Sequence, residues 1–182
     1  MIFKSILIVI EKYPITFGHT TVIKETSVRL QKMGYKVGIA AFSFKEEPPL
    51  NIEKIILDKK ILFSKKENLK FDIIHLHQPK MTYFFLFNKI NTPIILHYHG
   101  SSNLIQRLNF KISMKLFHRK IEKIIPVSNT ALNQIKKMSK NTPSVKVVFN
   151  GVDYNFFNNN KSNQFKKGIP QLIFVGGLRN YK

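Results

Sequence analysis

The stretch FDIIHLHQPKMTYFFLFNKINTPIILHYHG, residues 71–100, decides the fold class. It contains two short apolar runs, Phe71–His77 and Pro93–His99, that have the length and residue types of buried strands. Between them, Met81–Ile90 has the length of a helix, and we predict a helix there despite its aromatic residues. A strand, a helix and a second strand in this order are typical of parallel strands joined by a crossover helix. We therefore expect a parallel sheet, with Gly100 closing the second of these strands.

The same alternation of apolar runs and amphipathic segments continues on both sides of this stretch. Because the expected strands are apolar along nearly their whole length, both faces of the sheet should be covered by helices. The predicted fold class is therefore α/β. The further strands expected are Lys4–Ile10, Tyr35–Phe42, Glu53–Leu57, Ile124–Val127 and Lys146–Phe149, and the further helices are Thr20–Met33 (inner side Val22, Ile23, Leu30 and Met33), Asn103–Glu122 and Thr130–Lys140.

Composition limits the classes of function. The 182 residues suffice for one domain with a full core, and the absence of cysteine excludes disulfides and thiolate metal sites. No apolar run approaches the ~18 residues of a membrane span, and the N-terminal run is too short for a signal peptide. A soluble cytoplasmic protein is therefore expected. The formal net charge of +20 favours anionic partners, among them nucleic acid, acidic phospholipid and phosphorylated sugars.

The loop after the first strand contains Gly18 directly before a helix. Ligands of parallel sheets bind beyond the carboxyl ends of the strands, so this loop is a candidate site. It has neither the G-x-G-x-x-G pattern of a dinucleotide-binding fold nor a P-loop, which excludes a standard NAD domain or NTPase. The exposed N–H groups of the helix suit an anion or a sugar phosphate, and a plain turn glycine is an equal alternative.

Four histidines form two His-x-His pairs at the ends of neighbouring strands. His75 and His77 share one face of their strand, and His97 and His99 share one face of theirs. Four imidazoles could form a zinc site. However, no cysteine or carboxylate accompanies them except Asp72, which lies at the opposite end of its strand. We therefore predict no metal and interpret His75 and His97 as structural histidines with hydrogen bonds at the strand ends.

The predicted helix 103–122 carries basic residues at four-residue spacing beside an apolar stripe. Like charges at this spacing repel, and a solvated outer face is the simpler interpretation. Docking on an acidic membrane surface, at the inner face of the membrane, is the alternative. A nucleic-acid partner is not expected, because no binding motif is present. The basic residues are Arg107, Lys111, Lys115 and Arg119, and the stripe is Leu104, Ile105, Leu108, Ile112 and Leu116.

Three further motifs follow in the second half of the chain: IIPVSNT (124–130), VVFNGVDYNFF (147–157) and LIFVGGLRNYK (172–182). With D-x-x-H-x-H at 72–77 and H-G at 99–100, they resemble the middle of family 4 glycosyltransferases of the two-domain GT-B type. The resemblance implies a Rossmann-like acceptor-side domain over 1–157 and a linker over 158–170. Residues 171–182 would form the first strand of an otherwise missing donor-binding domain. A truncated reading frame explains this organisation better than one chain of a split enzyme.

The resemblance also implies a reaction, in which a retaining enzyme moves a sugar from a nucleotide diphosphate sugar to a hydroxyl of a glycolipid, polysaccharide or other glycan. The family needs no metal or other cofactor. Without the donor-binding half, the chain is expected to be inactive alone. A non-catalytic basic module that binds an acidic membrane is the alternative function.

Site residues follow from the resemblance position by position. His99 is expected at the reacting centre, where it would orient hydroxyls or phosphate and could offset developing charge. Two positions depart from the family pattern: Phe17 replaces the first glycine of the usual pair, and Gly177 replaces the arginine that normally contacts the donor diphosphate. The expected substrate-binding residues are Gly18, Gly100, Ser128 (also a helix cap) and Asn150 (also part of a tight turn), and the expected donor-diphosphate ligand is Lys182.

Overall fold

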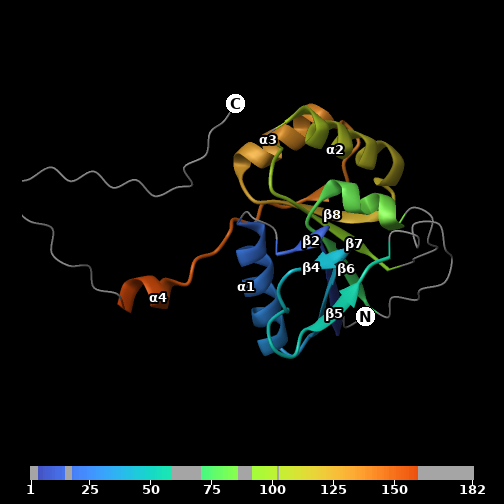
Figure 1. The fold of residues 1–182 in the computed structure, drawn as a ribbon. Helices are drawn as coiled ribbons and strands as arrows, with labels where there is room; N and C mark the ends of the chain where they lie inside the picture. The colour runs from blue at the N-terminus through green and yellow to red at the C-terminus, as the bar shows by residue number, and fades with distance from the viewer. Residues whose placement is uncertain (1–3, 15–17, 59–70, 86–91, 102, 160–182) are drawn as a thin grey trace, which may run out of the picture. The chain divides into compact units, whose positions relative to one another are not determined.

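The computed structural model describes residues 4–14, 18–58, 71–85, 92–101 and 103–159 (Figure 1). The chain divides into two compact units, Met1–Asn150 and Gly151–Lys182. The described part of the second unit contains helix α4 (Tyr154–Asn159). The domain end at residue 157 stays a prediction, and so do the linker and the strand expected after it, since residues 160–182 lie outside the described residues.

The first unit is built around a seven-stranded sheet whose order is β5-β3-β1-β6-β7-β8-β9. Every recorded pair of neighbouring strands is parallel. The chain runs outward from β1 to β5 and then continues on the other side of β1, which is the doubly wound arrangement of Rossmann-like folds. The predicted fold class is confirmed. The strands are β1 Ser5–Val9, β3 Lys36–Ala41, β5 Glu53–Ile56, β6 Ile73–Leu76, β7 Ile94–Tyr98, β8 Ile121–Pro126 and β9 Ser144–Val145, with a separate pair, β2 Lys12–Tyr13 and β4 Ser43–Phe44.

Helices cover both faces of this sheet (Figure 1). Because side chains alternate along a strand, Ile8 and Val9 of β1 enter different cores. Ile8 packs in the core that contains Ile23 of α1, and Val9 packs in the core that contains Phe110 of α2. Met33, expected on the inner side of α1, is 71% exposed, so that prediction is wrong. The helices are α1 His19–Lys32, α2 Leu104–Phe117 and α3 Asn129–Met138, with the 3₁₀ segment η2 at Pro79–Phe85.

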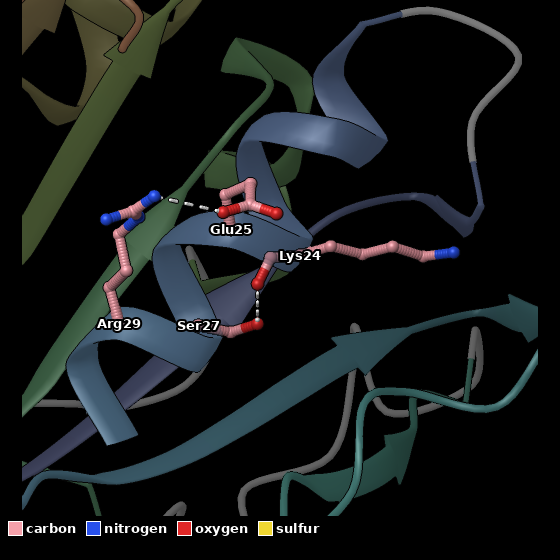
Figure 2. Close-up of polar contacts among 4 residues, drawn as sticks. All are labelled: Lys24, Glu25, Ser27 and Arg29. Carbon is pink, nitrogen blue, oxygen red and sulfur yellow. Dashed lines mark hydrogen bonds and ion pairs between the residues drawn. The ribbon is translucent and has the colours of Figure 1, made fainter. Parts of the chain in front are cut away.

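Polar contacts of α1 include two within the helix and one from Lys24 to a distant residue; Figure 2 shows the two within the helix. Arg29 pairs with Glu25 one turn earlier at 3.4 Å, an exposed contact that contributes a few tenths of a kcal/mol at most. Ser27 is fully buried, and its hydroxyl donates to the Lys24 carbonyl at 2.9 Å, which satisfies a polar atom on the inner side of the helix. The Lys24 ammonium points away from this group and pairs with Glu46. These contacts stabilise a helix whose first residue reaches the candidate site.

The segment predicted as helix 81–90 begins instead as η2, and residues 86–91 lie outside the described residues. Thr82 Oγ1 donates to the Pro79 carbonyl at 2.7 Å, and Ser113 Oγ of α2 donates to the same carbonyl at 2.9 Å. The Pro79 carbonyl therefore accepts hydrogen bonds from side-chain hydroxyls, whereas in an α-helix it would accept one from a backbone N–H of the next turn. One of these two hydroxyls belongs to α2, a contact that local sequence does not reveal.

Two other predicted elements have different extents. The helix expected over 103–122 ends at Phe117, after which the chain turns into β8. The strand expected over 146–149 is observed as β9, at residues 144–145. The N–H of Val148 still donates to a β8 carbonyl at 3.1 Å, so the chain continues beside β8 without regular strand geometry.

Candidate active site

The loops at the carboxyl ends of β1, β6, β7 and β8 meet at one edge of the sheet, as parallel strands require. Two cavities of about 230 and 460 Å³ lie there, and both are lined by His99, Gly100 and Ser101. The smaller one extends to the start of α2. The larger one extends to His19 at the start of α1 and to Ser128 before α3. This edge is therefore a concave site assembled from distant parts of the chain.

The turn after β7 is fixed in the conformation that forms both cavities. Gly100 has φ +91°, a backbone conformation that side-chain-bearing residues rarely adopt. The Ser101 N–H donates to Gln134 Oε1 of α3 at 2.9 Å, and the Ser101 hydroxyl bonds to the Tyr98 hydroxyl. Ser101 is buried. Because these contacts hold the turn from both sides, His99 emerges from β7 in a defined direction.

His99 lies among other imidazoles at the cavity edge. Its Nε2 is 3.0 Å from Nδ1 of His77, and either ring can be the donor, depending on the tautomers. Its ring centroid lies 4.0 Å from that of His19 and 4.6 Å from that of His97. If His77 donates, the Nδ1–H of His99 is left to donate to a ligand, and if His99 donates, its Nδ1 is left to accept. His99 can therefore orient a hydroxyl in either case.

The pKa values of these histidines are all lowered, mainly by burial. Burial and the neighbouring His19 lower the pKa of His99 to about 2, and burial with His97 lowers the pKa of His75 to about 3. Burial with His19 lowers the pKa of His97 to about 4, and burial holds the pKa of His77 well below its usual value. The rings are neutral at neutral pH. Neutral His99 does not supply the positive charge that the sequence-based hypothesis allowed.

The interpretation of His97 as a hydrogen-bonded structural histidine is wrong. Both of its ring nitrogens are buried and have no hydrogen-bond partner in the described part of the chain. The Nε2 atoms of His75 and His77 are also buried and have no hydrogen-bond partner in the described part of the chain. Since buried polar atoms are nearly always paired, this group of unpaired nitrogens needs an explanation.

The structure brings some of the predicted site residues together and not others. Ser128 lines the larger cavity, and its Oγ accepts the N–H of Ala131 at 3.1 Å, so the predicted helix cap is confirmed. Gly18 directly precedes α1 but lines neither of the two cavities. Asn150 is exposed and does not line them either. Lys182 lies outside the described residues.

Sequence reasoning missed several residues of the site, among them His19 and Gln134. His19 lines the larger cavity, and its only sequence signal is its place directly after Gly18. Gln134 lines the same cavity from α3 and holds the turn after β7. Asp72, set aside as lying at the wrong end of its strand, accepts the backbone N–H groups of Lys4 and Ser5 at the amino end of the sheet. Its role there is structural.

The chain is similar to one known protein family and to several solved structures. The model of Glycosyltransferase Family 4 matches residues 18–156. Three crystal structures of Anabaena Alr3699/HepE share the fold: the complex with UDP-glucose (TM-score 0.59, 13% identity), the complex with UDP (0.58, 14%) and the complex with UDP and glucose (0.57, 12%). These alignments cover 84%, 84% and 85% of this chain and 45%, 46% and 46% of the respective HepE chains. No curated protein matches the chain by sequence.

The chain belongs to Glycosyltransferase Family 4, because the family model covers well over half of its length. It spans about half the length of the HepE structures that it resembles. Within the described residues, no helix has the length and apolar character needed to cross a bilayer. The resemblance inferred from the motifs is therefore confirmed at the level of family and fold.

Proposed function

We propose that this chain forms the acceptor side of a retaining glycosyltransferase. The enzyme would transfer a sugar from a nucleotide diphosphate sugar to a hydroxyl of a glycolipid, polysaccharide or other glycan. The observation that carries the proposal is the pair of cavities that share His99 and Gly100 at the carboxyl edge of the sheet. Family membership supports the reaction class.

The roles of the residues follow from their chemistry. Neutral His99 presents one ring nitrogen to the cavity and orients an acceptor hydroxyl or a sugar hydroxyl by a hydrogen bond. Ser128 uses an oxygen lone pair for the helix cap, which leaves its O–H free to donate to substrate. During transfer the bond from the sugar C1 to the diphosphate breaks and a bond from C1 to the acceptor oxygen forms. The acceptor proton passes to the departing diphosphate, so no carboxylate base is needed.

The donor is proposed to bind mainly outside the described residues. HepE binds UDP-glucose and UDP, which makes UDP sugars the first donors to test. Lys182 is proposed to contact the donor diphosphate. Because this chain covers about half of the HepE length, we expect the 182 residues alone to lack transferase activity.

The test compares His99→Ala with wild type in a two-domain protein that carries this chain as its N-terminal half. We expect His99→Ala to reduce transfer from UDP-glucose by about 10²-fold or more, because a misplaced reacting group has this effect. The melting temperature should change little. A large fall in melting temperature with unchanged specific activity would mark His99 as structural and remove it from the site. Measurable transfer by the 182-residue chain alone would contradict its assignment as the acceptor side only.

Contact with an acidic membrane is a second proposed function, and the surface of α2 favours it. The helix buries Phe110, Met114 and Phe117 in the core. Its other apolar residues face outward, with Leu104 80% and Ile105 72% exposed. Beside this apolar stripe lie exposed basic residues, and a groove of about 530 Å³ between α2 and α3 combines both kinds of side chain. The groove is lined by Leu104, Ile105, Arg107, Leu108, Lys111, Lys137 and Met138.

An exposed apolar stripe flanked by cations matches the boundary between acyl chains and anionic headgroups. Sedimentation with phosphatidylglycerol vesicles should therefore exceed sedimentation with phosphatidylcholine vesicles and should weaken with salt. Leu108→Gln and Lys111→Gln should each reduce it, whereas Lys32→Gln on α1, which removes the same charge elsewhere, should not. Equal losses of binding for Lys32→Gln and Lys111→Gln would show that binding depends on net charge and not on the surface of α2. If the protein does not sediment with the vesicles, this second function is refuted.

A further inference from the structure

Three of the clustered histidines lie with their ring nitrogens close together beneath the candidate site. His75, His77 and His97 each offer a nitrogen, and these three atoms lie within 4.8 Å of one another. The arrangement follows from the parallel register of β6 and β7, in which His75 pairs with Ile95. Two residues further on, the same register places His77 beside His97 on one face of the sheet. His75 and His97 therefore lie within β6 and β7, and His77 directly follows β6, where its N–H donates to the Val9 carbonyl of β1 at 3.1 Å.

The unpaired nitrogens of this group point to an absent partner. His97 has two buried nitrogens without a hydrogen-bond partner among the described residues, and His75 and His77 have one each. The rings are also close to one another, with centroids 4.6 Å apart for His75 and His77, 4.8 Å for His77 and His97, and 5.3 Å for His75 and His97. Buried ring nitrogens without a hydrogen-bond partner are costly. One ion bound between them would satisfy three nitrogens at once.

Electrostatics around the group also suit metal ligation. Metal binding to histidine requires the neutral ring, and burial keeps all three rings neutral at neutral pH by lowering the pKa of each. Imidazole nitrogen selects zinc and neighbouring late transition metals, whereas magnesium and calcium require oxygen ligands. The group itself contains only imidazole ligands, so a hard cation does not fit.

We propose that His75, His77 and His97 bind one zinc ion, contrary to our sequence-based expectation of no metal. In a tetrahedral site with Zn–N of about 2.0–2.1 Å, ligand nitrogens lie roughly 3.4 Å apart. Zinc binding would therefore draw the three nitrogens together from their observed spacing of up to 4.8 Å. His99 lies next to the group, with its Nε2 3.0 Å from His77 Nδ1, and can accept a hydrogen bond from the Nδ1–H of a His77 that binds zinc through Nε2. The ion would join β6 to β7 below the site and takes no part in the sugar transfer proposed above.

The test is zinc titration of the untagged chain after treatment with EDTA, followed by calorimetry and thermal unfolding. We expect one zinc ion per chain and a higher melting temperature with zinc. His97→Gln and His75→Gln should each weaken zinc binding by more than about 100-fold, beyond the 10–100-fold that outer-shell changes cause. His118→Gln, which changes the one histidine outside the cluster, at the end of α2, should bind zinc like wild type.

A second measurement does not depend on the variants folding. In wild-type protein labelled with ¹⁵N in histidine, zinc should shift the ring signals of His75, His77 and His97 and leave those of His118 unchanged. Failure to bind zinc would refute the proposal, and so would binding that His97→Gln leaves intact. Ring shifts confined to His118 would also refute it and would indicate only a surface site. None of these measurements involves sugar transfer, so this proposal and the proposed function stand or fall separately.

Discussion

Acid should unfold the metal-free protein in a pH range set by its buried histidines. In the unfolded chain each imidazole titrates near about 6.5, whereas in the fold the pKa is about 3 for His75 and about 4 for His97. Below pH ~6.5 these imidazoles are therefore protonated in the unfolded chain while they stay neutral in the folded protein. The stability present above pH ~6.5 is lost as the pH falls towards the folded pKa values.

The magnitude follows from the same two residues. Between about pH 7.5 and about pH 5, each imidazole that stays neutral in the fold lowers the free energy of unfolding by about 2 kcal/mol. His75 and His97 together account for about 4 kcal/mol, a large part of the ~5–15 kcal/mol of a typical domain. Both folded pKa values lie below this pH range, so the two rings stay neutral in the fold throughout it. His77 and His99, whose pKa values are also lowered, act in the same direction.

The assay is urea unfolding in EDTA at several pH values, with His97→Leu as the comparison. Leucine removes two buried, unpaired nitrogens, so we expect the variant to be at least as stable as wild type near neutral pH. It should lose about 2 kcal/mol less than wild type on going to pH ~5. A wild-type free energy of unfolding that stays constant between pH ~7 and pH ~5 would refute the buried, neutral arrangement of these rings.

The remaining predictions concern the scaffold of the site. Gly38→Ala should destabilise the fold by about 1–3 kcal/mol in urea unfolding, because the added Cβ would lie 2.7 Å from the Phe71 ring and 3.2 Å from Leu7. The double variant Gly38→Ala with Phe71→Leu should recover part of this loss, and strictly additive losses would contradict the clash. Ser128→Ala should cost about 1 kcal/mol through loss of the α3 cap, and Ser128→Asn should cost much less. Equal losses for these two variants would show that the cap contributes little.

Much of the fold could be predicted from apolar runs alone. Strands β1 and β3 carry buried apolar side chains on both faces, and this pattern requires helices on both sides of a parallel sheet. The N-cap of α3 could also be predicted, since Ser128 accepts a backbone N–H of the first turn, as serine commonly does before a helix. The element ends were less predictable. The segment predicted as a helix begins as the 3₁₀ segment 79–85, which accepts a hydrogen bond from a hydroxyl of α2 that is distant in the sequence.

The candidate site was predictable where it lies in a strand end and unpredictable where helices complete it. The loop after β7 could be placed because a parallel sheet brings its strand ends to one edge, and the family resemblance singled out His99 and Gly100 within it. Gln134 could not, because its role depends on which turn of α3 faces the loop after β7. His19 was likewise hidden, since the sequence does not state that the first turn of α1 reaches the imidazole of His99.

The amino-acid sequence by itself determined the α/β class, the order of the strands along the chain and the motifs of family 4. These properties depend on local periodicity and on the spacing of motifs, both of which can be determined from the linear sequence. Only the tertiary structure decided that His19 of α1 joins the histidines of the two strand ends and that burial lowers their pKa values. The physical reason is that burial and the distance between charges are properties of packing, and packing brings together residues that the sequence keeps far apart.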